Sequence, residues 1–321
     1  MSDNMKSKRV ALFGTGNMGV EYNKILKYLD ADFSVFGHTQ DGVDRFYRHT
    51  GIKAIPNGIS GYENMGGANV EFAIVAVSVE ELAETAIRLM QSGIRNILLE
   101  KPAGLNIDEI KRVRDKAEET GSRTVIGYNR RFYSSVLKAQ EIIKKDGGVK
   151  SFYFEFTEWL HSIPDTIKEQ VKRHWFWANS THVIDLAFFL GGRPKKFSSF
   201  ISGRADWHAA ETSFAGAGVT EKGTLFSYHA NWLCPGRWGV EVMTDQNRLI
   251  FRPLEKLHIQ SNRSVNIDLV EIDEQLDRHF KPGLFRQTKS FLDGTEHPNF
   301  LSISSHYENA VNYYQQIVKG S

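Results

Sequence analysis

The sequence predicts an α/β protein with a doubly wound parallel sheet in its amino-terminal part and an α+β domain with an open, mostly antiparallel sheet in its carboxyl-terminal part. Two patterns support this fold class. In the first 127 of the 321 residues, short apolar runs alternate with segments of helical period, which is typical of parallel strands joined by crossover helices. Beyond residue 133, strand-like runs follow one another with few helices between them. We therefore expect one domain at residues 1–127 and a second at residues 128–321.

The first domain is expected to contain five strands with helices between them. We place the strands at residues 9–13, 33–36, 72–77, 95–99 and 123–127, with a weaker candidate at 52–55. The clearest helix is 106–120, because apolar residues recur there at helical spacing and charged residues occupy the other face. Gly121 is expected to end this helix.

The second domain is expected to begin with a helix that ends near Lys145 and to continue mainly as strands. A helix is also expected at 181–190, and two more at 284–293 and 303–318. The expected strands cover residues 149–159, 196–204, 211–219, 223–232, 239–243, 248–251 and 265–272.

Composition excludes several classes of protein. Hydrophobic residues make up 41% of the chain and charged residues 24%, which is typical of a globular protein. The formal net charge of +2 gives no general attraction to nucleic acid or to an anionic membrane, and no apolar run is long enough for a membrane-spanning helix. With a single cysteine and a polar amino-terminal segment, we expect a cytoplasmic protein that binds neither nucleic acid nor membranes.

A glycine-rich turn directly follows the first expected strand. Its residues are Gly14, Thr15, Gly16, Asn17, Met18 and Gly19. Glycines at these positions allow a tight turn, close approach of a pyrophosphate to the backbone, and close packing of helix on strand. An ordinary strand-to-helix turn is the alternative, but the alternating strand and helix pattern that follows favours a Rossmann-type dinucleotide site.

The end of the second strand indicates which dinucleotide is bound. An acidic side chain normally binds the adenosine ribose there, but this chain has Gly37, His38 and Thr39. Without a carboxylate to repel a 2′-phosphate, His38, Thr39 and Arg45 could receive one. The sequence therefore slightly favours NADP(H), and NAD(H) remains the alternative.

Glu100, Lys101 and Pro102 follow the strand at 95–99, where ligands bind in doubly wound sheets. A lysine at this place can donate hydrogen bonds to a substrate oxygen and stabilise developing negative charge. The alternative is a simple turn that begins a helix, in which proline fixes the backbone.

The helix expected at 181–190 contains His182 and Asp185, which share a face because they are three residues apart. An imidazole with a pKa near neutrality can exchange a proton with a substrate hydroxyl. A buried histidine in a purely structural role is the alternative.

These motifs, with the sequence Gly-Tyr-Asn-Arg-Arg-Phe at 127–132, resemble the Gfo/Idh/MocA oxidoreductases over essentially the whole chain. The resemblance implies hydride transfer between a nicotinamide and a hydroxyl or carbonyl of a sugar, sugar acid or nucleotide sugar. It implies that Lys101 is the family lysine and His182 the general acid or base, acting together on one hydroxyl. Asp185, Asn129 and Arg131 are implied to lie beside the substrate or the nicotinamide.

Two positions depart from the family pattern. Ala178 stands where many members have an aspartate four residues before the histidine, so the proton relay is expected to differ. The third main strand ends in Val77 and Ser78 instead of the usual Pro-Asn, and we expect these residues to contact the cofactor in their own way.

Basic and aromatic residues of the second domain are expected to bind an anionic carbohydrate through stacking and hydrogen bonds. The candidates are Lys172, Arg173, Trp175 and Arg237. No metal site is expected, because the histidines lack metal-ligand spacing. The alternation of Ser213, Ala215, Ala217 and Val219 predicts a strand face buried in a homodimer or homotetramer.

Two other functions remain open at this point. An enzyme with tightly held NAD could oxidise a glycoside transiently and then eliminate or hydrolyse it. A protein without catalysis could bind NAD(P) to sense redox state. The presence of both Lys101 and His182 favours a dehydrogenase or reductase acting on CH–OH groups.

Overall fold

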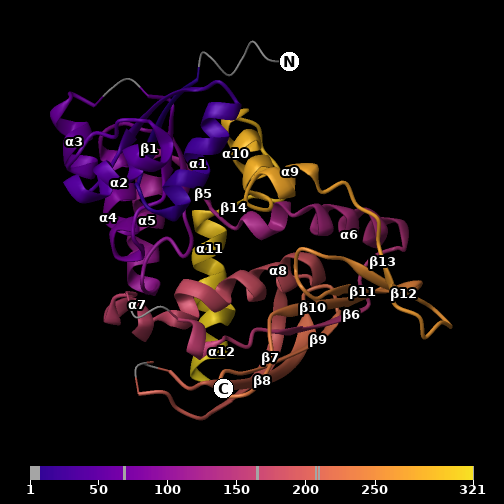
Figure 1. Cartoon of the computed structure of the whole chain (residues 1–321). Coiled ribbons are helices and arrows are strands. Elements are labelled where there is room, and N and C mark those ends of the chain that lie inside the picture. The colour runs from indigo at the N-terminus through magenta and orange to yellow at the C-terminus, as the bar shows by residue number, and fades with distance from the viewer. Residues whose placement is uncertain (1–7, 68–69, 164–165, 207, 209, 321) are drawn as a thin grey trace. The chain divides into compact units, whose positions relative to one another are not determined.

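The computed structural model describes residues 8–67, 70–163, 166–206, 208 and 210–320, and these group into two compact units (Figure 1). The first unit contains the described residues up to Asn129 together with Leu276–Glu308. The second contains Arg130–Gln275 and the described residues from Asn309 onward. The α/β fold class predicted from the sequence is confirmed.

The first unit is built on a six-stranded sheet in the order β14-β5-β4-β3-β1-β2. Neighbouring strands from β5 to β2 are parallel, and only β14 runs antiparallel to its neighbour β5. The chain runs from β1 to β2 in one direction across the sheet and from β3 through β5 in the other, so the sheet is doubly wound. The strands are β1 (Arg9–Phe13), β2 (Asp32–Phe36), β3 (Phe72–Val75), β4 (Asn96–Leu99), β5 (Arg123–Ile126) and β14 (Leu301–Ser302).

Helices connect these strands, and their ends follow from the local sequence. In α5 (Ile107–Thr120), the side chain of Asn106 accepts a hydrogen bond from the backbone N–H of Glu109, and Gly121 ends the helix with φ of 65°. The expected helix at 106–120 is thus confirmed. The other helices are α1 (Asn17–Tyr28), α2 (Gln40–Thr50), α3 (Gly58–Asn64), α4 (Leu82–Gln91), α9 (Gln275–His279), α10 (Leu284–Leu292) and α11 (Ile303–Asn309).

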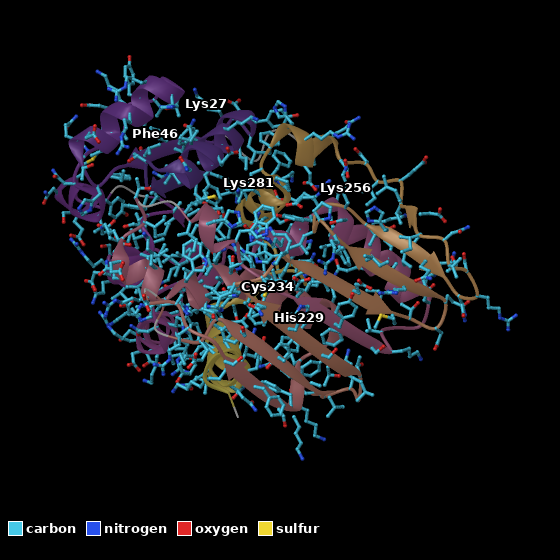
Figure 2. The ribbon with its side chains drawn as sticks, turned by 60° about the horizontal axis from the view of Figure 1, so that its bottom comes forward. Lys27, Phe46, His229, Cys234, Lys256 and Lys281 are labelled. Atoms are coloured by element: carbon cyan, nitrogen blue, oxygen red, sulfur yellow. The ribbon has the colours of Figure 1, made fainter. Side chains whose placement is uncertain are left out.

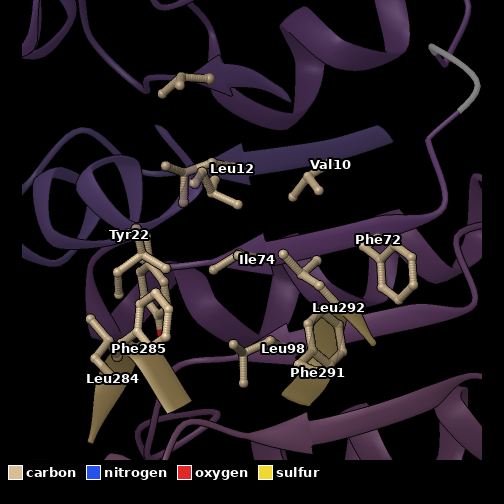
Figure 3. Close-up of a cluster of buried hydrophobic side chains, with 14 of the residues drawn as sticks. Val10, Leu12, Tyr22, Phe72, Ile74, Leu98, Leu284, Phe285, Phe291 and Leu292 are labelled. Atoms are coloured by element: carbon tan, nitrogen blue, oxygen red, sulfur yellow. The ribbon is translucent and has the colours of Figure 1, made fainter. Parts of the chain in front are cut away.

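The core of the first unit joins α1, the sheet and α10 (Figure 3). Leu284, Phe285, Phe291 and Leu292 of α10 are buried with the strand residues Leu12, Ile74 and Leu98. This burial explains why a segment near the end of the chain packs on the first sheet. The assignment of cofactor and substrate domains to residues 1–127 and 128–321 stays a prediction about function.

The second unit contains an eight-stranded sheet in the order β13-β12-β11-β10-β6-β9-β8-β7. Its neighbouring strands are antiparallel except for the parallel pair β6 and β9. The strands are β6 (Ser151–Glu155), β7 (Pro194–Ser202), β8 (Ser213–Thr220), β9 (Leu225–Asn231), β10 (Gly239–Met243), β11 (Asn247–Phe251), β12 (His258–Ser261) and β13 (Asp268–Leu269).

Three expected strands differ from the structure. The run at 149–159 forms a strand only at Ser151–Glu155, and the run at 265–272 only at Asp268–Leu269. The weak candidate at 52–55 contributes a single bridge between Ile55 and Phe36. Strand β12 was not predicted, because its four residues have no clear apolar alternation.

Helix α8 (Thr181–Gly191) packs on one face of this sheet. The ring of Phe188 lies 5.9 Å from Phe152 and 5.4 Å from Phe154. A Cβ at Gly191 would lie 2.3 Å from the Phe152 ring, so the close contact between helix and sheet requires glycine. The unit also contains α6 (Ser134–Lys145), α7 (Glu169–Arg173) and α12 (Gln315–Lys319), and π-helical turns precede α8 and α12 at Phe176–Ser180 and Ala310–Tyr314. Within the described part of the chain, no helix is both long and apolar enough to cross a membrane.

Candidate active site

The glycine-rich turn between β1 and α1 has the geometry that a dinucleotide requires. Gly14 has φ of 118°, and a Cβ there would lie 2.2 Å from the carbonyl oxygen of Ala76. A Cβ at Gly19 would lie 2.1 Å from the carbonyl oxygen of Gly14. At Gly16, in contrast, a Cβ would have no neighbour within 4 Å. The first and third glycines therefore permit tight backbone packing, while the second leaves the backbone open to an approaching pyrophosphate.

Three predicted ligand segments follow the carboxyl ends of neighbouring parallel strands. The glycine-rich turn follows β1, Val77 and Ser78 follow β3, and Glu100 and Lys101 follow β4. Because parallel strands end at the same edge of a sheet, this edge gathers these segments within the first unit. The chain direction across the sheet also reverses between β1 and β3, which is where doubly wound sheets bind ligands.

The residues after β2 have contacts that the sequence did not reveal. His38 Nδ1 lies 2.9 Å from Glu81 Oε1, and Ser78 Oγ donates a hydrogen bond of 3.1 Å to Glu81 Oε2. Thr39 Oγ1 accepts a hydrogen bond from the N–H of Gly42, and Arg45 forms an ion pair of 3.0 Å with Asp41. A carboxylate thus does lie near the end of β2, but it comes from the segment after β3.

Glu100 is a buried carboxyl group next to the candidate lysine. Tyr22, on α1, donates a hydrogen bond of 2.7 Å to Glu100 Oε1. Burial raises the pKa of Glu100, while the Tyr22 hydrogen bond and the charges of Lys101 and Lys281 oppose this rise. Glu100 therefore links the helix of the glycine-rich turn to Lys101.

Lys281 is a second lysine near Glu100 that sequence reasoning missed. It precedes α10 (Figure 2), and its charge acts on the same buried carboxyl group as that of Lys101. Asn129 holds this segment, because its Nδ2 donates a hydrogen bond of 2.9 Å to the carbonyl oxygen of Pro282. His306, on α11, contacts the turn after Lys101, because its Nε2 lies 2.9 Å from the carbonyl oxygen of Pro102. The predicted residue Asn129 thus positions a loop of the first unit.

His182 is buried at the start of α8 in the second unit, with 6% of its surface exposed. The π-helical turn before it is held by Glu158, a buried residue of the loop after β6. Glu158 accepts hydrogen bonds of 2.7 Å from Ser180 Oγ and 2.8 Å from Asn179 Nδ2. Burial raises the pKa of Glu158, and these hydrogen bonds partly oppose the rise. A carboxyl group therefore supports the helix that contains His182, although position 178 is alanine.

Asp185 and Arg131 form a buried bidentate ion pair. Arg131 donates hydrogen bonds of 2.8 Å from Nε and 2.6 Å from Nη2 to the two carboxylate oxygens of Asp185. The guanidinium also lies over the ring of Phe189, at 4.5 Å from its centroid. Both residues were predicted to bind substrate, but the structure directs their charged atoms toward each other.

Three further candidates for substrate binding, Lys172, Arg173 and Trp175, lie in or just after the short helix α7. Arg173 is exposed, and its Nε lies 3.4 Å from Glu169 Oε1. Lys172 and Trp175 are half-buried on either side of it. Arg173 also lines a cavity of about 330 Å³ with residues of β7 and α12.

Comparison with known proteins finds a family that matches the amino-terminal part of the chain. Residues 8–128 match the model of a family described as "Oxidoreductase family, NAD-binding Rossmann fold", GFO_IDH_MocA. This match confirms the resemblance to the Gfo/Idh/MocA oxidoreductases that the motifs predicted. The amino-terminal region thus resembles the NAD-binding Rossmann part of this oxidoreductase family, and the open backbone at Gly16 leaves room for the pyrophosphate of such a cofactor.

Solved structures share the fold over nearly the whole chain. A UDP-N-acetylglucosamine 3-dehydrogenase from Acidithiobacillus ferrooxidans is 15% identical with a TM-score of 0.74, and 96% of each chain is covered. A levoglucosan dehydrogenase in complex with NADH and levoglucosan is 17% identical with a TM-score of 0.77, covering 97% of this chain and 96% of that one. An oxidoreductase from Agrobacterium radiobacter, in complex with NAD⁺, L-tartaric acid and magnesium, is 11% identical with a TM-score of 0.78 over 97% and 96%. No curated protein sequence matches the chain.

Proposed function

We propose that the protein is an NAD(P)-dependent dehydrogenase or reductase that acts on a hydroxyl or carbonyl group of a sugar, sugar acid or nucleotide sugar. The main support comes from the carboxyl edge of the parallel sheet. Strands β1 and β4 both end at this edge, and the glycine-rich turn follows β1 while Lys101 follows β4. This edge combines a dinucleotide site with a cationic side chain suited to a substrate oxygen.

In this proposal Lys101 and His182 serve the same reaction. The bound nicotinamide dinucleotide supplies the hydride acceptor or donor. The ammonium group of Lys101 donates a hydrogen bond to the substrate oxygen and stabilises its negative charge. The imidazole of His182 accepts the hydroxyl proton in oxidation and returns it in reduction. The turn held by Glu158 fixes the start of the helix on which His182 lies.

The carbohydrate class is supported by the names of two proteins with this fold, the levoglucosan and UDP-N-acetylglucosamine dehydrogenases. Sugars also suit a protein whose second unit places indole and guanidinium groups next to its buried histidine.

For the cofactor, we propose that NADP(H) is bound at least as well as NAD(H). Support comes from the absence of a carboxylate at positions 36–39. Glu81 acts against NADP(H) binding, because its negative charge lies beside His38, the residue expected to receive the 2′-phosphate.

We also propose that the chain forms a homo-oligomer through the open face of the eight-stranded sheet. On this face Phe200 pairs with Ala215 across β7 and β8, and Val219 pairs with Leu225 across β8 and β9. Phe200 is 68% exposed and Leu225 64% exposed in the single chain. A second copy of the chain is the expected occupant, because an identical face offers a complementary apolar surface.

The direct test of the proposed function has two steps. Mass spectrometry identifies any dinucleotide released from the purified protein, and a panel of neutral and acidic sugars is then tested for a change in absorbance at 340 nm. Turnover with at least one sugar supports the proposal. A retained dinucleotide without net turnover indicates transient oxidation coupled to elimination or hydrolysis, and weak reversible binding without turnover indicates a sensor. Either of these results would contradict it.

A further inference from the structure

Trp238, which precedes β10, brings two arginines and the candidate histidine together in the second unit. The indole is buried, with 7% of the residue exposed. The guanidinium carbons of Arg237 and Arg130 lie 4.6 Å and 4.8 Å from its ring centroid. The centroid of the His182 ring lies 6.3 Å from the same indole. Two cationic groups thus converge next to the residue proposed to move the proton.

Arg237 is held between two indole rings. Its guanidinium carbon lies 4.5 Å from the ring centroid of Trp159 and 4.6 Å from that of Trp238. Such stacking holds the planar guanidinium by its faces and leaves the N–H groups at its edge able to form hydrogen bonds. The side chain is therefore oriented before any ligand arrives.

The backbone around Arg237 is also held in place. Its N–H donates a hydrogen bond of 3.0 Å to Glu155 Oε1, and Trp159 Nε1 donates one of 2.6 Å to the carbonyl oxygen of Gly236. Arg252 forms an ion pair of 2.9 Å with the other oxygen of Glu155. The charge of Glu155 is thus paired with that of Arg252 and not with that of the Arg237 guanidinium.

Neither stacked arginine forms an ion pair within 4 Å with a carboxylate of the described residues, in contrast to Arg131 with Asp185. Nε of Arg130 is buried and has no hydrogen-bond partner among the residues that the structure describes. Two carboxyl groups interact with Arg237: Glu155, which accepts its backbone N–H and pairs with Arg252, and Glu158, whose two oxygens accept hydrogen bonds from Ser180 and Asn179. Positive charge therefore exceeds negative charge around Trp238.

We infer that Arg237 and Arg130, stacked on Trp238, form a subsite for an anionic group of the substrate. The group is a carboxylate or a phosphate, because the fork of N–H groups on a guanidinium matches two oxygens of either. The inference rests on the proposed function for its relation to the reaction, and it narrows the substrate to a sugar acid, a sugar phosphate or a nucleotide sugar. It also identifies Arg130 as a specificity-determining residue beside the predicted Arg237.

Binding without turnover tests the inference. Isothermal titration calorimetry would compare D-glucose, D-glucuronate, glucose 6-phosphate and UDP-N-acetylglucosamine on the full chain. We expect at least one anionic probe to bind tenfold or more tightly than D-glucose. Glucuronate as the preferred probe identifies a carboxylate subsite, and either phosphorylated probe identifies a phosphate subsite. Equal affinity for all four, including no measurable binding, would overturn the inference.

Variants of Arg237 test whether this residue causes the preference for anionic probes. Arg237→Gln is expected to remove the anionic preference, and Arg237→Lys to restore part of it, since a lysine keeps the charge but loses the planar fork. Arg204→Gln is the matched control, because Arg204 is an exposed arginine of the same unit near Glu211. A preference that survives in folded Arg237→Gln protein would contradict the assignment. Anion binding without hydride transfer would instead refute the proposed function and leave the subsite standing.

Discussion

The guanidinium of Arg131 donates two hydrogen bonds to the carboxylate of Asp185, and both side chains are buried. Arg131 belongs to the segment after the first sheet, while Asp185 lies on α8, one turn after His182. Burial lowers the pKa of Arg131, but the charge and hydrogen bonds of Asp185 outweigh it and raise the pKa, so the arginine stays charged in its buried position. The pair therefore connects the start of the second unit to the helix of the candidate histidine.

This pair predicts a large loss of stability on substitution of Asp185. Asp185→Ala leaves a buried guanidinium without its partner, and breaking such a pair typically costs about 3–5 kcal/mol. Urea denaturation monitored by circular dichroism would measure the change in the free energy of unfolding. An unchanged free energy together with a raised KM for substrate would show instead that Asp185 contacts the substrate, as the family resemblance implied.

Glu158 predicts a pH-dependent difference in stability between the wild type and Glu158→Gln. Because burial raises the pKa of Glu158 in the folded state, the folded protein binds the proton more tightly than the unfolded chain does. This contribution to stability is present below the ordinary carboxyl pKa and is lost as the pH rises through the raised value. Glutamine cannot titrate, so the variant lacks this contribution. Glu100 also has a raised pKa, but it is present in both proteins, so its effect cancels in the comparison.

The free energy of unfolding of Glu158→Gln, relative to the wild type, should therefore increase as the pH rises above 4.5, the ordinary carboxyl pKa. Urea denaturation at several pH values would measure it. A difference that is constant, or that decreases over this range, would show that the pKa of Glu158 is not raised in the folded protein.

Cofactor preference is predicted to depend on Glu81. Glu81→Gln removes a negative charge beside His38, so it should increase the affinity for NADPH relative to NADH. Glu84→Gln is a suitable control, since Glu84 contacts Arg112 on an exposed surface. Calorimetric titration with both dinucleotides measures the ratio. A tenfold preference of the wild type for NADH would contradict the proposed cofactor, and an unchanged ratio in Glu81→Gln would exclude Glu81 as its determinant.

Gly37 is a less suitable position than Glu81 for testing cofactor preference. Introducing an aspartate there places a carboxylate at the end of β2, but its Cβ would lie 2.7 Å from Val43 Cγ2 and 2.8 Å from Thr15 Cγ2. Gly37→Asp should therefore weaken the binding of both dinucleotides, because Thr15 belongs to the glycine-rich turn.

The oligomer is predicted to depend on the open face of the second sheet. Phe200→Glu places a charge on this face opposite Ala215, so it should shift an oligomer toward monomer without lowering monomer stability, since Phe200 is largely exposed. Light scattering coupled to size-exclusion chromatography measures the mass at micromolar concentration. A monomeric wild type would refute the proposed interface.

Much of both sheets could be predicted from local sequence, because each strand from β1 to β5 is a short apolar run between turn residues. The glycine-rich turn was also predictable, since each glycine has a local structural task. The two-residue strand β14 was not, because it exists only through its pairing with β5 and has no pattern of its own. The packing of α10 on the first sheet depends likewise on distant contacts.

The candidate site was predictable only where its residues belong to motifs. Lys281, Glu81 and Glu158 were missed, because each acts on a residue far away in the sequence through a single side chain. The ion pair of Arg131 and Asp185 was hidden for the same reason, since sequence spacing places both residues near a site but does not show that they face each other.

The central claim is that Lys101 and His182 both serve hydride transfer to or from a carbohydrate, and steady-state kinetics at 340 nm on their alanine variants test it most directly. Positioned proton transfer is typically worth about 10² to 10⁴ in rate, so Lys101→Ala and His182→Ala should each lower kcat at least about a hundredfold. The dissociation constant of the dinucleotide should change little, and Lys289→Ala, an exposed lysine paired with Asp293, should behave as wild type. If both alanine variants retained the wild-type kcat, the account of this site would be contradicted.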